Sequence, residues 1–136
     1  LKIRRRQVSM ATEGSRRLAA NRWSEITRLH LNGEHDRAIR MERYLENHGR
    51  RFFRGLDVNA LAARMKLLKP SEQEAQLRGK VHSNLQRLLQ SDYLFADEKR
   101  VLREVSKKLE KYAQEKKWGE ALLLAARIPY RAVLFR

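Results

Sequence analysis

The sequence lacks cysteine altogether, and only two prolines and six glycines interrupt its 136 residues. Without cysteine the chain has no disulfide, no thiolate zinc site and no cysteine nucleophile. No apolar run approaches the ~20 residues that a membrane-spanning helix needs, so we expect no membrane span. The segment Leu1–Met10 is basic and lacks the apolar stretch of a secretory signal. Together these absences favour a cytoplasmic protein in a reducing, intracellular setting.

Negative charge is scarce as well. The chain has 16 aspartates and glutamates against 31 lysines and arginines, which gives a formal net charge of +15. Such a surplus repels itself in a compact protein, and a polyanionic partner is the commonest reason to carry it. The sequence therefore predicts nucleic acid, DNA or RNA, as the partner. An acidic protein bound by a helical hairpin, self-association, and an anionic membrane surface are the alternatives.

Apolar residues recur at helical spacing, and no segment shows the alternation of a β-strand. The sequence therefore predicts an all-α fold: a compact bundle of five or six mostly antiparallel helices with a basic N-terminal arm. We expect a flexible arm over residues 1–14 and a single all-helical domain over residues 15–136. The expected helices are Ser15–Asn32, His35–His48, Val58–Leu68, Ser71–Ser91, Glu98–Lys117 and Trp118–Arg127. Residues 130–136 form either a short helix or an extended segment.

Polar residues and glycine mark the expected helix ends. Gly33 suits the left-handed conformation that commonly follows a helix. Ser15, Asp57, Ser71 and Asp97 are expected N-caps, because their side-chain oxygens can accept hydrogen bonds from the first helical N–H groups. Glu74 lies three residues after Ser71, the spacing of a capping box.

The helix expected over residues 98–117 has two distinct faces at 100° per residue. Its apolar face carries Val101, Leu102, Val105, Leu109 and Tyr112. The opposite side carries Lys99, Arg100, Arg103, Lys107 and Lys111. A charged helix face is often only a solvated face, and the nearby Glu104 and Glu110 fit that alternative. The functional interpretation is that these cations contact phosphates.

Two other basic clusters are candidates for the same role. One lies in residues 1–17, which contain six cations and a single acid. The alternative interpretation of this segment is a flexible terminus without function. The other surrounds Phe52 and Phe53, whose rings either stack on bases or fill the core. The predicted nucleic-acid-binding residues are Lys2, Arg4, Arg5, Arg6, Arg16, Arg17, Arg50, Arg51, Arg54, Lys99, Arg100, Arg103, Lys107 and Lys111, with Phe52 as a base-stacking residue.

Catalytic and metal-binding patterns are missing. None of the four histidines has the His-x-x-x-His spacing of a metal site, and the scattered glycines form no phosphate-binding loop. We expect the histidines at the surface or at helix ends. The sequence therefore predicts no catalytic residue, no metal and no cofactor. It indicates a non-enzymatic accessory protein that contacts the phosphate backbone with limited sequence specificity.

Two segments, Leu29–Ile39 and Tyr112–Leu122, share the pattern of a helix, a turn and a helix that opens with alanine and an aliphatic residue. The second resembles the turn of a tetratricopeptide hairpin. The further aromatic and glycine positions of that repeat are absent from both segments. We therefore interpret both as helical hairpins that arose independently of that family.

Overall fold

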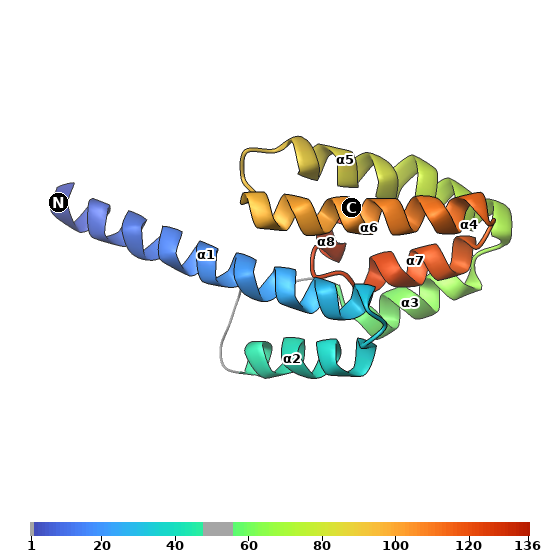
Figure 1. Ribbon diagram of the computed structural model, residues 1–136, viewed down its shortest axis with the longest axis horizontal. Coiled ribbons are helices and arrows are strands. Elements are labelled where there is room, and N and C mark those ends of the chain that lie inside the picture. Colours follow the sequence, from blue (N-terminus) through green and yellow to red (C-terminus); the bar gives the residue numbers. More distant parts are fainter. Residues whose placement is uncertain (1, 48–55) are drawn as a thin grey trace.

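The computed structural model describes the backbone of residues 2–47 and 56–136. Solvent exposure and side chains are described for residues 16–46 and 56–136, and solvent exposure also for Gly14. In chain order the elements are α1 (Lys2–Leu31), α2 (His35–Asn47), α3 (Val58–Leu67), α4 (Pro70–Gln76), the π-helical turn η2 (Leu77–Val81), α5 (His82–Gln90), α6 (Ala96–Gln114), α7 (Trp118–Arg127) and α8 (Arg131–Leu134) (Figure 1). The all-α prediction is confirmed for these segments. None of the helices in them is long and apolar enough to cross a lipid bilayer.

The described segments contain seven helices packed against each other when α4, η2 and α5 are counted as one continuous helix. The sequence predicted five or six. The additional helix is α8, a single turn in the tail that the sequence left undecided between helix and extended chain. Short one-turn helices carry too few residues for a periodic signal, so sequence pattern alone does not detect them.

The start of α1 differs from the prediction. The helix begins at Lys2 and not at Ser15, so a separate basic arm over residues 1–14 is not confirmed. Residues 2–13 contain neither proline nor glycine, and their arginines, lysine, glutamine, methionine and alanine are strong helix formers. These propensities outweigh the cap signal of Ser15. The end of α1 is as predicted, because Gly33 has a φ of 80° in the turn to α2.

Among the other predicted caps, one is confirmed and two are wrong. Asp57 caps α3, since its Oδ1 accepts hydrogen bonds from the N–H groups of Asn59 (2.8 Å) and Ala60 (3.1 Å). Ser71 does not begin a helix, because α4 already starts at Pro70. Proline suits the first helical position, where no N–H is required.

The N-terminus of α6 is capped by a different acid from the one expected. Phe95 occupies the N-cap position, and its N–H donates to the carboxylate of Glu98 at 2.9 Å. Asp97 was predicted to be the cap, but it lies in the first turn and pairs with Arg28 of α1 at 2.7 Å. The two acids are adjacent in the sequence, so pattern alone did not separate their roles.

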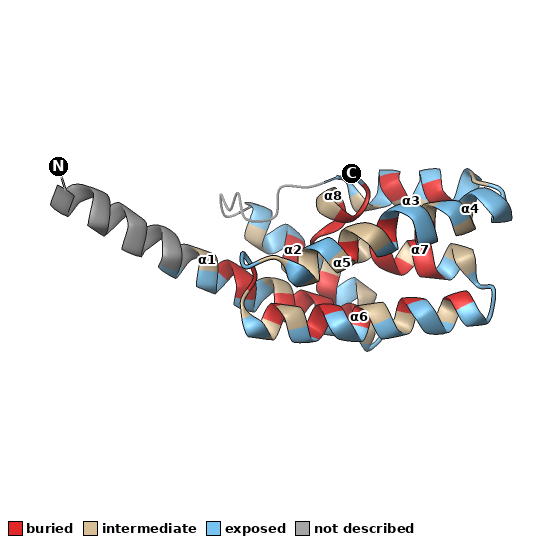
Figure 2. Cartoon of the chain, turned by 90° about the horizontal axis from the view of Figure 1, so that it is seen from above, coloured by how far each residue is buried: buried red, intermediate tan, exposed pale blue. Residues whose placement is uncertain are grey.

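The core forms around α7, which is largely buried between its neighbours (Figure 2). Its alanines allow α3 and α6 to approach closely, as both helices contact it. The predicted apolar face of α6 is confirmed: Val101, Leu102, Val105 and Leu109 are buried, and Tyr112 is half-buried. Consequently the opposite side of α6 faces solvent.

Three of the contacts that attach α1 to the rest of the bundle lie in its C-terminal half. The ring of Trp23 packs edge-on against Tyr130, with 5.0 Å between ring centroids. Arg28 pairs with Asp97, and the Nζ of Lys108 donates to the carbonyl of Leu31 at 3.0 Å. The last two contacts join α1 to α6, so the C-terminal half of α1 lies alongside α6.

Candidate nucleic-acid interface

Four cations follow the solvent-facing side of α6. Arg100, Arg103, Lys107 and Lys111 are all exposed, and helical geometry places them within about 80° of one another around the helix axis. We call these four residues the α6 basic face. None of them forms an ion pair within 4 Å with a carboxylate of the described residues. Their charge is therefore available to an external anion.

The α6 basic face is long compared with the charge spacing of nucleic acid. Eleven residues separate Arg100 from Lys111, which corresponds to ~16 Å at the helical rise of about 1.5 Å per residue. A duplex rises about 3.4 Å per base pair, so this face matches roughly five base pairs in length. Two exposed carboxylates lie at its edges: Glu104 beside Lys111 and Glu110 beside Arg103, each about 20° outside the span of the four cations.

Lys99, the fifth cation predicted on this helix, is half-buried and lies about 40° beyond Arg103 around the helix axis, outside the span of the other four. At 100° per residue it lies about 100° from Arg100, toward the α5 side. The prediction grouped Lys99 with the other four cations because the sequence does not indicate where α5 packs against α6. Its position makes it the least accessible of the five cations.

The structure brings Arg16 and Arg17 to the same end of α6. The guanidinium of Arg16 donates to the carbonyl of Tyr93 at 2.8 Å and lies over the Tyr93 ring, 4.3 Å from its centroid. The guanidinium of Arg17 lies 4.4 Å from the ring of Phe95, the N-cap of α6. Cation–π contacts of this type stabilise exposed sites by about 0.5–1 kcal/mol. Arg16 therefore helps to fasten α1 to the α5–α6 turn, while Arg17 remains exposed.

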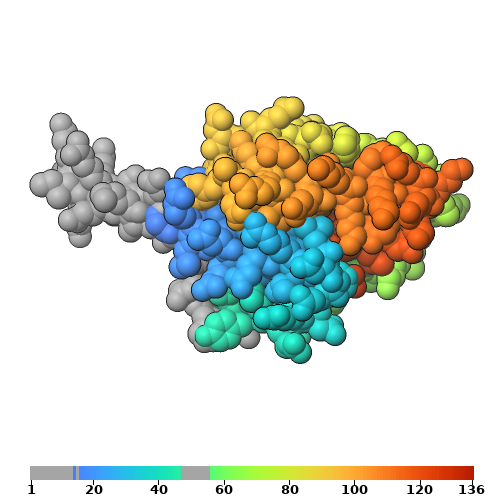
Figure 3. Space-filling model, in the orientation of Figure 1, coloured from blue at the N-terminus to red at the C-terminus, as the bar shows by residue number. Residues whose placement is uncertain are grey.

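Figure 3 shows the C-terminal half of α1 and all of α6 side by side on one face of the molecule. Arg17 contacts Phe95, the N-cap of α6, and Phe95 lies five residues before Arg100. Arg17 is therefore near the Arg100 end of the α6 basic face. Two of the predicted clusters thus meet. A sequence separation of 77 residues between Arg16 and Tyr93 explains why the pattern alone did not reveal the contact.

The other predicted site residues lie outside the described parts of the structure. This applies to the side chains of Lys2, Arg4, Arg5 and Arg6, and to the whole of Arg50, Arg51, Phe52 and Arg54. Their role in binding stays a prediction.

Several other cations are paired within the described residues. The ion pairs are Arg22–Glu25, Arg28–Asp97, Arg37–Glu34, Arg78–Glu74, Lys117–Glu115 and Arg131–Glu42. The first five are exposed, and such pairs stabilise a fold by about 1 kcal/mol or less. They reduce the positive potential locally. Other exposed cations, such as Arg64, Lys66 and Lys80, are also outside these pairs, so the α6 basic face is distinguished by the alignment of its four cations along one helix.

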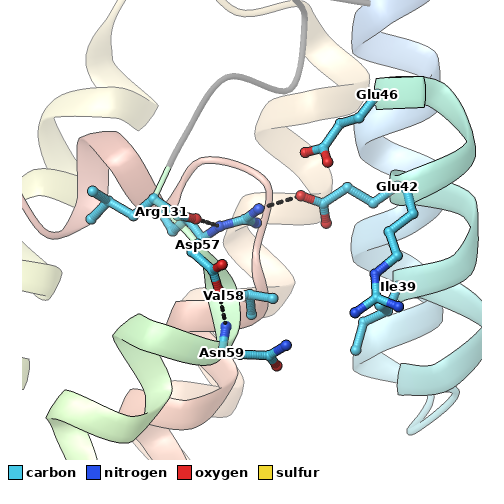
Figure 4. A pocket seen from close by; sticks show the side chains of 9 residues that line it. Ile39, Glu42, Glu46, Asp57, Val58, Asn59 and Arg131 are labelled. Carbon is cyan, nitrogen blue, oxygen red and sulfur yellow. Dashed lines mark hydrogen bonds and ion pairs between the residues drawn. The ribbon is translucent and has the colours of Figure 1, made fainter. Parts of the chain in front are cut away.

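The sixth pair is buried and structural. Arg131 is 4% exposed and donates to Glu42, to the carbonyl of Leu56 at 2.5 Å and to the carbonyl of Ile128 at 3.3 Å. Figure 4 shows the guanidinium directed toward Glu42, and both residues line a pocket of about 290 Å³. Burial, followed by the neighbouring Glu42, raises the pKa of the Glu46 carboxyl on the same pocket. Because Arg131 is fully engaged, it adds no charge to the outer surface.

Two histidines meet at the turn between α1 and α2; both lie at helix ends, as expected, but His30 is buried. His30 is only 1% exposed, and its Nδ1 lies 3.0 Å from the Nδ1 of His35. Burial, the nearby His35 and the cations Arg127 and Arg131 lower the pKa of His30 to about 3. The pKa of His35 is lowered by burial and by Arg127 and Lys108. Both rings are therefore neutral at physiological pH.

No cluster of three or more histidine, aspartate or glutamate side chains that could hold a metal ion occurs in the parts of the chain that the structure describes. No protein-family model, curated protein or solved structure matches this chain. The functional argument therefore depends on the geometry and charge of the residues themselves.

Proposed function

We propose that the protein binds nucleic acid, with the α6 basic face as its main contact with the phosphate backbone and no enzymatic activity of its own. The observation that carries this proposal is the row of four exposed cations, none in an ion pair within 4 Å with a described carboxylate, along ~16 Å of one rigid helix. A helix packed on the core through its opposite side holds these side chains in a fixed register. Less conformational freedom is then lost when an anion binds.

Binding of this kind is directed at the sugar-phosphate backbone of the nucleic acid. Lysine and arginine side chains on a solvent-exposed face reach phosphates readily, but phosphate contacts carry no base information. We therefore expect limited sequence specificity for DNA or RNA. Arg17 extends the surface beyond the Arg100 end of α6, and the cations of residues 2–6 and 50–54 would add further phosphate contacts.

The proposal predicts a characteristic salt dependence. Each phosphate contact on duplex DNA contributes about 0.9 to the slope of log K against log[salt]. Replacing Arg103, Lys107 and Lys111 by glutamine removes three contacts, so the slope should shrink by about 2–3. The control variant replaces Arg64, Lys66 and Lys80, which are also exposed but lie on α3 and η2. It removes the same charge and should leave the slope close to that of the wild type.

The measurement is fluorescence anisotropy with a labelled DNA duplex, a DNA single strand and an RNA single strand, from ~50 to ~200 mM salt. Equal losses in the two variants would mean that net charge alone attracts the polymer, and the proposed surface would be wrong. If the wild type bound none of the three probes at low salt but captured an acidic protein, the protein-interaction alternative would replace the proposal.

A further inference from the structure

A second pocket lies where the α1–α2 turn meets α6 and α7. Its volume is about 220 Å³, enough for several water molecules at roughly 30 Å³ each, and therefore for one hydrated oxyanion. The lining residues come from all of these elements: His30, Gly33, His35, Lys108, Tyr112, Glu120, Leu123, Leu124 and Arg127. It is separate from the α6 basic face, because Lys108 lies on the α1 side of α6.

The contact between the two histidines fixes which ring nitrogens carry hydrogen. The Nε2 of His30 is buried and has no hydrogen-bond partner among the described residues. If that nitrogen carried the proton, a buried donor would be left unpaired, at a cost of about 1–3 kcal/mol. The favoured tautomer therefore has His30 Nδ1–H donating to Nδ1 of His35. His35 then carries its proton on Nε2, which gives this half-buried ring a free donor.

Two permanent cations line the same pocket. Lys108 donates one of its three N–H groups to the carbonyl of Leu31, which leaves two donors. Arg127 is half-buried at the end of α7 and forms no ion pair with a described carboxylate within 4 Å. Glu120 is the single carboxylate of the lining. Two cations and a neutral histidine donor against one acid make the pocket electropositive.

We propose that this pocket binds a phosphoryl-type oxyanion, with Arg127, Lys108 and the Nε2–H of His35 as its donors. Arginine presents a fork of N–H groups that matches two phosphate oxygens, and lysine adds a point charge. Burial is the main cause of the lowered pKa of both histidines, and the nearby cations lower it further. This inference does not rest on the proposed function, since a free phosphate ion would satisfy the same donors.

Proton uptake should accompany binding. A bound anion favours the imidazolium form, so the pKa of His35 should rise when the pocket fills. The titratable and charged groups that face the two histidines from the surrounding elements are Asp36 of α2, Lys108 and Tyr112 of α6, Glu120 and Arg127 of α7, and Arg131 of α8. Among these, the cations Arg127 and Lys108 lower the pKa of His35 and Asp36 raises it.

The test is an NMR titration of the His35 imidazole with inorganic phosphate on the full chain, against chloride at matched ionic strength. We expect a saturable shift with phosphate only, together with an increase in the pKa of His35. Arg127→Gln should weaken phosphate binding roughly tenfold or more. Arg127→Lys should retain part of it, and Arg64→Gln, on α3, should retain all of it. Circular dichroism of each variant separates lost binding from lost folding.

The same response to chloride, or wild-type phosphate affinity in a folded Arg127→Gln variant, would overturn the proposal. A further arm identifies the source of the oxyanion. A 5′-phosphorylated dinucleotide that binds more tightly than inorganic phosphate and competes with it supports the pocket as a site for a nucleic-acid end. Equal or weaker binding of that dinucleotide supports it as a site for free phosphate. The unphosphorylated dinucleotide should leave the His35 signal unchanged.

Discussion

The buried pair of Arg131 and Glu42 should couple the α1–α2 hairpin to the C-terminal part of the chain. Replacing Glu42 by leucine leaves a guanidinium that is 4% exposed with the carbonyls of Leu56 and Ile128 as its hydrogen-bond partners. Removing one partner of a buried ion pair costs about 3–5 kcal/mol, because the remaining charge is uncompensated. We expect a loss of that size in the free energy of unfolding for Glu42→Leu and for Arg131→Met.

The assay is urea unfolding followed by circular dichroism, which gives the free energy of unfolding for the wild type, both single variants and the double variant. The double variant should be much less destabilised than the sum of the two single variants, since it leaves no buried charge. If both single variants lay within about 0.5 kcal/mol of the wild type, as exposed pairs do, our account of this pair would be refuted.

Two further predictions concern single positions. Burial raises the pKa of the Glu98 carboxyl, which accepts a hydrogen bond from Tyr130. The contribution of Glu98 to stability is therefore full below the ordinary pKa of 4.5. It decreases as the pH rises through the higher pKa of the folded state. Urea unfolding across this window should show that decrease in the wild type and not in Glu98→Gln; parallel pH profiles would contradict it. Gly33 has a φ of 80°, so Gly33→Ala should cost about 1–2 kcal/mol, whereas Gly14→Ala, in α1 with open space around the new methyl, should gain roughly 0.5–1 kcal/mol. Thermal melts of the two variants that shifted in the same direction would count against this reasoning.

Much of the fold could be predicted because its signals are local. The bounds of α7 are as expected, and the apolar face of α6 follows directly from helical periodicity. Asp57 and Gly33 lie at helix ends as predicted, because the residues next to them in the sequence are enough to indicate a helix end. The exposure of the α6 basic face follows from the same periodicity, because a helix that buries one side presents the other to solvent.

The features that the sequence did not reveal depend on tertiary contacts. Arg131 and Glu42 are 89 residues apart, and nothing near either residue indicates that it is buried. His30 and His35 are close in sequence, but their contact depends on how α1 turns into α2. Whether an acid caps a helix or pairs with another helix, as Asp97 does, is likewise decided by which helix packs beside it.

The central claim is that the α6 basic face contacts nucleic-acid phosphates, and backbone amide NMR during titration with a short DNA duplex tests it most directly. Our account predicts that the largest chemical-shift changes fall between Arg100 and Lys111 of α6 and at Arg17, and that they reverse when salt is raised. Changes confined to other helices, or a uniform response over the whole basic surface, would contradict it.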